Sequence, residues 1–169
     1  MAKLIKPIPD LEQSYRDYIR ELGDEERYPF PLDFDHTDFD GLLNQLADLE
    51  AGHNLPEGRV PSSTFWLVEG GELLGVSNLR HHLNEALEEC GGHIGLGIRP
   101  SQRGKGLGNT LMRLTLQEAA KMGIDEVHVH CHKDNAASAR MIVRCGGVLH
   151  SEVLEPSTDH TVQRYVIHP

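Results

Sequence analysis

Residues 103–108 read Arg-Gly-Lys-Gly-Leu-Gly, and they stand between a short apolar stretch at 93–98 and a helix-like segment at 109–122. Gly104, Gly106 and Gly108 lack the Cβ atoms that would keep a ligand away from the main chain, and glycine adopts positive φ at little steric cost. At the start of a helix, the unpaired N–H groups and the positive end of the helix dipole attract an anion. The order of strand, glycine loop and helix therefore predicts a phosphate-binding loop. A flexible, solvated turn is the simpler alternative.

The charge around this loop differs from that of the chain as a whole. The sequence has 16 Lys+Arg against 26 Asp+Glu, a formal net charge of -10, yet residues 94–116 contain no carboxylate. Arg99, Arg103 and Lys105 place positive charge in that interval. The local charge therefore favours an anionic ligand.

Two common phosphate-binding motifs do not fit the loop. A P-loop requires G-x-x-x-x-G-K-[ST], but Arg99 stands five residues before Gly104, and Gly106 follows Lys105 where a hydroxyl is needed for magnesium. A dinucleotide fingerprint requires G-x-G-x-x-G, and read from Gly104 its last position is Asn109. Asp125 lies at a suitable distance downstream, so the dinucleotide interpretation survives only weakly.

A third motif, R-x-x-G-x-G, is matched at every fixed position by Arg103, Gly106 and Gly108. With it, the sequence resembles the GNAT superfamily of N-acetyltransferases. The resemblance extends over about half the chain, from residue 64 to 147, in the order of strands, loop, long helix, further strand and second helix. The second helix follows Asn135, with the small residue Ser138 three positions later and glycines at its end, as that family shows.

The resemblance implies acetyl-CoA as a co-substrate and assigns the residues that would bind it. The loop residues would cradle its pyrophosphate: Arg103, Gly104, Lys105, Gly106, Leu107, Gly108 and Asn109. The strand before the loop would splay from its neighbour, so that the backbone of Leu96, Gly97, Ile98 and Arg99 pairs with the pantetheine arm and the thioester carbonyl. Gly95 and Gly97 suit a close backbone approach. Asn135 and Ser138 would also meet the coenzyme, although Asn135 could equally serve as the N-cap of the second helix.

One position departs from the family pattern and concerns the general acid. Many members carry a tyrosine seven residues after the asparagine, where its hydroxyl can protonate the departing thiolate, but this chain has Ile142. The usual acid is therefore absent or has moved. Ser138, Cys131 and Tyr165 have labile protons, and their spacing does not choose among them. Direct attack with protonation of the thiolate by solvent also remains open.

A general base is needed to keep the attacking amine neutral. His93, at the start of the coenzyme strand, is our first choice because imidazole titrates near neutral pH. Glu88 and Glu89 on the preceding segment are alternatives. Each of these three side chains could also be an ordinary exposed surface residue with no catalytic role.

A run of histidines at 128–132 supports a different hypothesis. His128, His130 and His132 would share one face of a strand and could bind zinc with a fourth ligand from elsewhere. The simpler interpretation is a strand with an exposed polar face and with Val127, Val129 and Cys131 in the core. We expect no metal, because the chain lacks paired ligand spacing of the zinc-finger type.

Composition indicates one globular domain over residues 1–169. The chain is 38% hydrophobic and 25% charged. No apolar run approaches the roughly 20 residues of a membrane span, and the N-terminus lacks the apolar region of a signal peptide, so we expect a cytoplasmic protein without membrane contact. Cys90, Cys131 and Cys145 are odd in number and lack C-x-x-C spacing, which predicts reduced thiols. The acidic balance argues against nucleic acid as a partner.

The hydrophobic pattern predicts an α/β fold with a mixed sheet flanked by helices, and the resemblance implies that these elements follow the GNAT order. The expected helices are 10–22, 39–51, 109–122 and the segment after Asn135. The expected strands are 3–6, 65–69, 73–80, 93–98, 126–131, 148–154 and 162–167, with a hairpin at Gly70-Gly71. Residues 24–38 should form a loop, and residues 84–92 a loop or a short helical turn.

These observations lead to one functional hypothesis and two rivals. The chain is predicted to be an N-acetyltransferase that moves the acetyl group of acetyl-CoA to an amine, on a small molecule or a peptide, by direct attack. The rivals are a catalytically silent acyl-CoA-binding protein and a metal-binding or regulatory module built on His128–His132. The resemblance also allows a homodimer. The acceptor itself cannot be read from the N-terminal helices.

Overall fold

The computed structural model describes all residues, 1–169. Its larger sheet has four antiparallel strands in the order β1-β2-β3-β4. The bounds are β1 Lys3–Ile5, β2 Ser62–Glu69, β3 Glu72–Arg80 and β4 Ile94–Ile98. Gly70 and Gly71, with φ of 59° and 77°, make the predicted turn between β2 and β3. Glycine is required there because L side chains rarely adopt this conformation.

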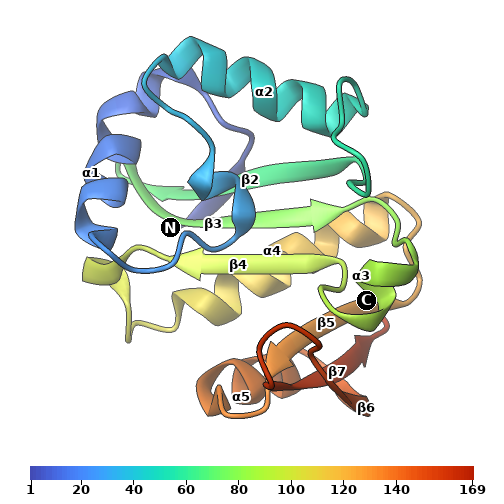
Figure 1. Cartoon of the computed structure of the whole chain (residues 1–169). Helices are drawn as coiled ribbons and strands as arrows, with labels where there is room; N and C mark the ends of the chain where they lie inside the picture. The colour runs from blue at the N-terminus through green and yellow to red at the C-terminus, as the bar shows by residue number, and fades with distance from the viewer.

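The smaller sheet contains β5 Val127–His132, β6 Val148–Leu154 and β7 Thr161–Ile167, in the antiparallel order β5-β7-β6. It joins the larger sheet at one end of β4, where Gly92 and Val129 form an isolated bridge. There the His93 N–H donates to the His128 carbonyl at 2.7 Å. Beyond this bridge β4 and β5 separate (Figure 1). The seam between the two sheets is therefore closed at one end and open at the other.

Helices cover both faces of the larger sheet. On one face lie α1 Glu12–Leu22 and α2 Phe39–Ala51, whose apolar stripes pack on Trp66, Val68 and Val76. On the other face lies α4 Leu107–Lys121, and α5 Ala136–Arg144 lies beside the smaller sheet (Figure 1). The remaining short elements are η1 Pro9–Leu11, η2 Phe30–Asp33, α3 Glu85–Glu89 and η3 Pro100–Gln102. The α/β class with helices on both faces of a sheet is confirmed.

Aromatic residues near the N-terminus fill the core under α1 and α2. Tyr15 stacks on Trp66 with ring centroids 5.6 Å apart, and both side chains are buried. These two rings are therefore part of the core.

Most predicted boundaries lie within a few residues of the observed ones, and α2 has the predicted bounds. Strand β2 begins three residues earlier than expected, at Ser62. Its first three residues are polar but buried, because the Asn78 amide of β3 donates to the Ser62 hydroxyl at 3.0 Å. Hydrophobic periodicity does not detect a strand segment whose buried side chains are polar. The short helix η2 was missed because two prolines at 29 and 31 read as a loop.

Two further sequence expectations concern membranes and thiols. The structure contains no helix with the length and hydropathy of a membrane span. All three cysteines are unpaired, as predicted.

Candidate functional site

The glycine loop ends where α4 begins. Gly104 and Gly106 have φ of 78° and 77°, in the left-handed region that favours glycine, and Gly106 is the residue that caps α4. A Cβ atom placed on Gly104, Gly106 or Gly108 would meet no atom within 4 Å. The loop therefore faces open space.

The first turn of α4 presents unpaired N–H groups. Gly106 has no side chain to accept a hydrogen bond, and the first turn contains no acidic residue. The N–H groups of residues 107–109 consequently lack intrahelical partners, as in the first turn of any helix. Together with the helix dipole these groups favour an anion over the first turn of α4, where the anion site stays a prediction.

Of the three cations expected at this loop, one is turned away from it. The Arg99 side chain is 11% exposed and binds Glu21 through Nε at 2.5 Å and Glu72 through Nη1 at 3.1 Å. Its backbone N–H donates to the Leu74 carbonyl at 2.9 Å. The expectation that Arg99 contributes charge and a free backbone group is therefore wrong, since α1 and β3 supply partners for both.

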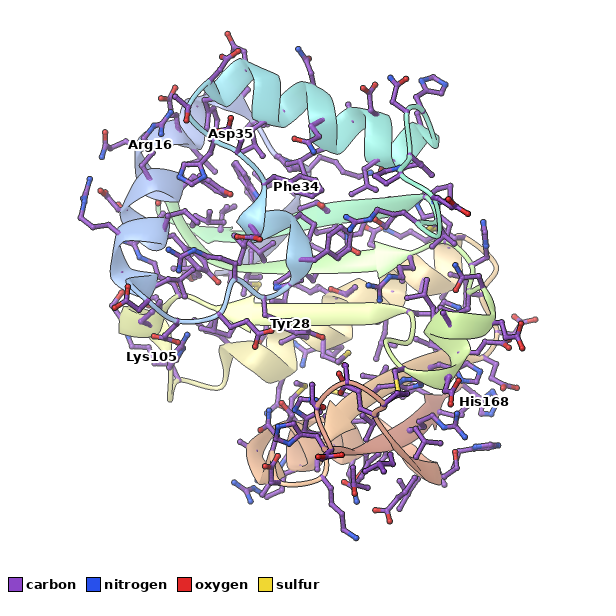
Figure 2. The ribbon with its side chains drawn as sticks, viewed as in Figure 1. Arg16, Tyr28, Phe34, Asp35, Lys105 and His168 are labelled. Carbon is purple, nitrogen blue, oxygen red and sulfur yellow. The ribbon has the colours of Figure 1, made fainter.

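Arg103 and Lys105 remain at the loop. Arg103 donates from Nε to the Ile98 carbonyl at 3.0 Å and pairs with Glu25 through Nη1 at 2.9 Å. The Lys105 ammonium contacts only Gln102, at 3.1 Å, and points out from the loop before α4 (Figure 2). Both cations can thus reach an anion bound over the first turn of α4.

A cleft of about 730 Å³ extends from this loop into the open end of the seam. Its walls come from α1 and the segment after it, from β4, from the glycine loop and from α5. The lining residues are Tyr18, Leu22, Glu25, Glu26, Tyr28, Leu96, Gly97, Ile98, Arg103, Gly108, Asn135, Ala137, Ser138 and Met141. An elongated ligand with an anionic end fits this shape.

Strand β4 offers backbone groups to the cleft. Arg80 N–H bonds to the His93 carbonyl, and Arg99 N–H bonds to the Leu74 carbonyl. Hydrogen-bonded pairs alternate along an antiparallel ladder, so Gly95 and Gly97 direct their backbone groups to β3. Leu96 and Ile98 direct theirs to the opposite edge, into the cleft. The predicted backbone site on this strand therefore narrows to two residues.

Tyr28, on the segment between α1 and α2, lies over β4 (Figure 2). A Cβ atom at Gly95 would lie 2.9 Å from the Tyr28 hydroxyl, and one at Gly97 would collide with the Tyr28 carbonyl oxygen. The close backbone approach predicted for these glycines is thus made by the chain itself. Desolvation raises the pKa of Tyr28, so its hydroxyl keeps its proton at neutral pH.

A second cavity, of about 390 Å³, lies next to the cleft. It is lined by Glu26, Tyr28, Cys90, Gly91, His130, Cys131, His132, Asn135, Ser138, Glu155 and Val162. Four residues line both spaces: Glu26, Tyr28, Asn135 and Ser138. A ligand in the cleft and a ligand in the second cavity would meet at these four side chains.

The family model for acetyltransferases of the GNAT family matches residues 11–146. The chain belongs to the GNAT family. In this family the loop, cleft and splayed strand are the expected coenzyme site.

Curated relatives match part of this GNAT chain. Mycothiol acetyltransferase of Streptomyces coelicolor is 31% identical over 99 residues, which cover 59% of this chain and 31% of that protein. The enzyme of the same name from Streptomyces avermitilis is 28% identical over 99 residues, with the same coverage. The matched part is thus about a third of the length of these relatives.

Solved structures resemble the GNAT chain along almost its whole length. One is the Salmonella typhimurium acetyltransferase that modifies the N-terminal serine of ribosomal protein L7/L12, with TM-score 0.72, 14% identity, and coverage of 99% of this chain and 95% of that one. Mutant forms of the spermidine/spermine N-acetyltransferase SpeG of Vibrio cholerae superpose with TM-score 0.65 and 16% identity, covering 99% of this chain and 95% of that one. The YncA protein of Salmonella typhimurium was solved with its cofactor acetyl-CoA. It superposes with TM-score 0.64 and 16% identity, covering 99% of this chain and 93% of that one. These similarities show the fold.

His93, the predicted base, lies away from both spaces of this GNAT site. It is buried, its Nδ1 accepts the backbone N–H of His128 at 2.9 Å, and it lines neither cavity. Burial, with smaller contributions from His128 and Arg80, lowers its pKa to about 4. The structure therefore places His93 in the closed end of the seam, where it joins β4 to β5. Glu88 and Glu89 also line neither cavity.

The three histidines of β5 do not form one exposed face. His130 is buried, its Nδ1 accepts the Gly91 N–H at 3.1 Å, and its Nε2 is buried without a partner. Burial, then His128 and Arg164, lower its pKa to about 4. His128 pairs with Glu126 at 3.0 Å, and His132 with Glu155 at 2.9 Å. The expected exposed polar strand is therefore wrong for His130, because α3 and the segment after it cover this end of β5.

Asn135 and Ser138 lie where the cleft and the second cavity meet. The Asn135 Oδ1 accepts the Ser138 backbone N–H at 3.2 Å, which makes Asn135 the N-cap of α5. Its Nδ2 remains free for a ligand, so the two roles weighed for this residue are compatible. Ile142, where many family members carry tyrosine, is 1% exposed and belongs to the core.

Sequence reasoning missed Tyr28 and Glu26, which precede the recognised core in the chain. Two more missed residues, Arg113 and Arg144, line a space of about 370 Å³ between α4 and α5, next to Asn109. The spacing of Asn109 and Arg113 by four residues could have indicated a cation one turn into α4. Nothing in the local pattern signals Tyr28, because a chain reversal brings it over β4.

Proposed function

We propose that this chain transfers the acetyl group of acetyl-CoA to a primary amine of a small molecule or a peptide. The observation that carries the proposal is the junction of the two cavities at Tyr28, Asn135 and Ser138, with the anion site at the far end of one of them. A thioester held in the cleft would reach this junction, and an amine in the second cavity would face it.

The chain's own residues fit the coenzyme. The first-turn N–H groups of α4, with Arg103 and Lys105, would hold the pyrophosphate. The backbone groups of Leu96 and the N–H of Ile98, whose carbonyl accepts from Arg103, would pair with the pantetheine arm and hold the thioester carbonyl, while Asn135 Nδ2 would bind the same arm from the opposite wall. Donors fixed in this way stabilise the charge that develops on the carbonyl oxygen.

The second cavity suits a cationic acceptor. Its lining contains the carboxylates of Glu26 and Glu155 and no lysine or arginine. Glu26 lines both spaces and would accept, directly or through water, the proton that the amine must lose. The neutral amine nitrogen then attacks the thioester carbonyl carbon and the carbon–sulfur bond breaks.

Tyr28 would protonate the departing thiolate. Its hydroxyl lies over Gly95, beside the strand whose backbone would hold the thioester, and keeps its proton at neutral pH. Ser138 and Cys131 also line the second cavity and have labile protons. Burial raises the pKa of the Cys131 thiol, so the thiolate needed for an acyl-enzyme forms less readily. Direct transfer is therefore the favoured route.

Acetyl-CoA binding and turnover test the proposal. Millimolar acetyl-CoA should raise the thermal midpoint by mass action, and thiol release should require an added amine. A panel of polyamines, monoamines and peptides with free N-termini, compared with amines that carry a carboxylate, should show faster release with the cationic acceptors. No midpoint shift would overturn the coenzyme assignment, and a shift without thiol release would leave a binding protein.

A further inference from the structure

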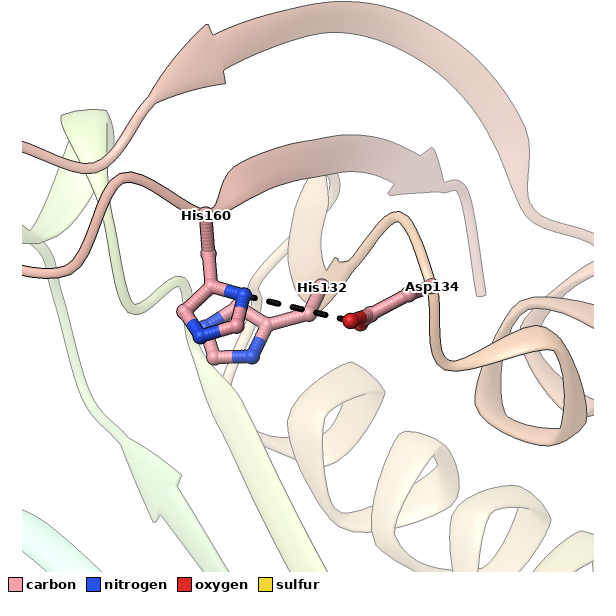
Figure 3. Close-up of side chains that lie close together, drawn as sticks. All are labelled: His132, Asp134 and His160. Carbon is pink, nitrogen blue, oxygen red and sulfur yellow. Dashed lines mark ion pairs between the residues drawn. The ribbon is translucent and has the colours of Figure 1, made fainter.

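A cluster of metal-binding side chains lies at the outer rim of the second cavity. His132 ends β5, Asp134 follows in the turn before α5, and His160 lies in the turn before β7. One donor atom from each residue lies within 4.8 Å of the others. Figure 3 shows the three side chains converging from two separate turns.

The two histidine rings are stacked face to face, so each must turn its in-plane nitrogen lone pair toward the ion before both can bind it. Their centroids lie 4.5 Å apart with 9° between the planes, and His160 Nδ1 is 3.9 Å from Asp134 Oδ2. A metal with nitrogen ligands at about 2.0–2.1 Å needs donor atoms about 3.3 Å apart in a tetrahedron. All three side chains are exposed, so rotations that close the remaining gap of up to about 1.5 Å meet little packing resistance.

Glu155 prepares one ligand. Its carboxylate lies 2.9 Å from Nε2 of His132, so this nitrogen donates and the Nδ1 lone pair is left free. A carboxylate bonded to the far nitrogen of an imidazole is the arrangement that orients histidine toward a metal and raises its basicity. This contact is the feature that separates the cluster from a chance meeting of polar side chains.

We propose that His132, Asp134 and His160 bind a divalent transition metal, with Zn²⁺ as the ion of choice, and that water completes the coordination. Two imidazoles and one carboxylate favour Zn²⁺, Ni²⁺ or Cu²⁺ over Mg²⁺ or Ca²⁺, which prefer oxygen ligands. This site differs from the histidine strand considered above. Of those three histidines it takes only His132, which alone lies together with Asp134 and His160.

The metal would tie two turns together at the mouth of the second cavity. His132 and Glu155 line that cavity, and Asp134 is the neighbour of the helix-capping Asn135. Residues 155–160 connect β6 to β7 and are otherwise held by few contacts, among them the Glu155 N–H bond to the His160 carbonyl at 2.8 Å. Binding would therefore order the rim on the side where the amine is proposed to enter.

Zinc titration of the full chain, first stripped with a chelator, tests the site. We expect one equivalent of Zn²⁺ to bind by calorimetry and to raise the thermal midpoint, with no effect of Mg²⁺ at the same concentration. His160→Ala and Asp134→Asn should each weaken the Zn²⁺ affinity at least tenfold. His150→Ala is the matched control, because His150 is exposed on β6 and bonds only Ser151.

Two results would overturn the proposal: Zn²⁺ affinity unchanged in both site variants, or weakened as much by His150→Ala. Acetyl-CoA binding is measured on the same zinc-free samples. A failure there would refute the proposed function while leaving the zinc result to stand by itself.

Discussion

At the scale of single residues, the general acid that we propose comes from a different element than the family pattern suggests. Ile142 is 1% exposed, and a Cβ atom at Gly147 would lie 2.8 Å from its carbonyl oxygen, so the end of α5 closes tightly around it. A tyrosine hydroxyl at this position would enter the core instead of the cleft. Tyr28 supplies a hydroxyl from the opposite wall.

Replacing Tyr28 tests whether this residue supplies the proton that a tyrosine at position 142 supplies in many family members. Tyr28→Phe should lower kcat for acetyl transfer about 100-fold, the lower range for loss of a general acid, and leave the Kd for acetyl-CoA nearly unchanged. Stopped assays of thiol release and calorimetric titration provide the two quantities. Tyr165→Phe is the control, since that buried hydroxyl bonds Gln163 and lines neither cavity. Equal activity of the Tyr28 variant and the wild type would assign the proton to solvent or to Ser138.

At the scale of elements, the three glycines of the loop meet different structural requirements. Gly104 and Gly106 adopt positive φ, whereas Gly108 lies inside the first turn of α4 with ordinary helical backbone. Only Gly108 can accept a side chain without strain, and it lines the cleft. Substitutions at Gly106 and Gly108 can therefore separate the effect of backbone conformation from the effect of a side chain in the cleft.

Gly108→Val should weaken acetyl-CoA binding at least tenfold, because the new side chain stands in the cleft, while the midpoint of the ligand-free protein stays the same. Gly106→Val should in addition lower stability by about 1–2 kcal/mol, since valine is strained in the left-handed region. Thermal unfolding with and without acetyl-CoA measures both effects. A fully retained affinity in Gly108→Val would place the coenzyme elsewhere.

The elements also show how far the sequence could be interpreted. Helices and strands follow from hydrophobic periodicity, and the glycine loop at the start of α4 follows from glycine spacing, because both signals are local. The placement of Tyr28 over Gly95 and the withdrawal of Arg99 toward Glu21 depend on contacts between segments about 70 to 80 residues apart. No local pattern records such contacts, so the base, the acid and the second cavity could not be derived.

At the scale of the whole molecule, the seam between the sheets is closed by neutral histidines. His93 bonds the backbone of His128, and His130 bonds the backbone of Gly91. Burial is the main reason that both folded-state pKa values fall to about 4. In the unfolded chain these groups should titrate near 6.5.

The free energy of unfolding should therefore depend on pH within a defined range. Between about pH 6.5 and 4 the unfolded chain binds protons that the folded chain does not, so the free energy of unfolding falls as the pH falls, by on the order of 3 kcal/mol for each histidine. Above pH 7 both groups are neutral in either state and this contribution is complete. Denaturant unfolding from pH 7.5 to 4.5 measures the slope.

His93→Asn should flatten that slope, because the Asn carbonyl can accept the His128 N–H without titrating. His150→Asn, on the exposed β6, should leave it unchanged. A wild-type slope in His93→Asn would show that other groups dominate the acid sensitivity.

Tyr28, Glu26, Asn135 and Ser138 form a common wall between the cleft and the second cavity. A shared wall has a kinetic consequence. Under the proposed function, acetyl-CoA and the amine would contact the same four side chains from opposite sides, and we expect both to be bound together before the acetyl group moves. Initial-rate plots at several fixed amine concentrations would then intersect instead of running parallel, and free CoA would compete with acetyl-CoA for the same form of the enzyme.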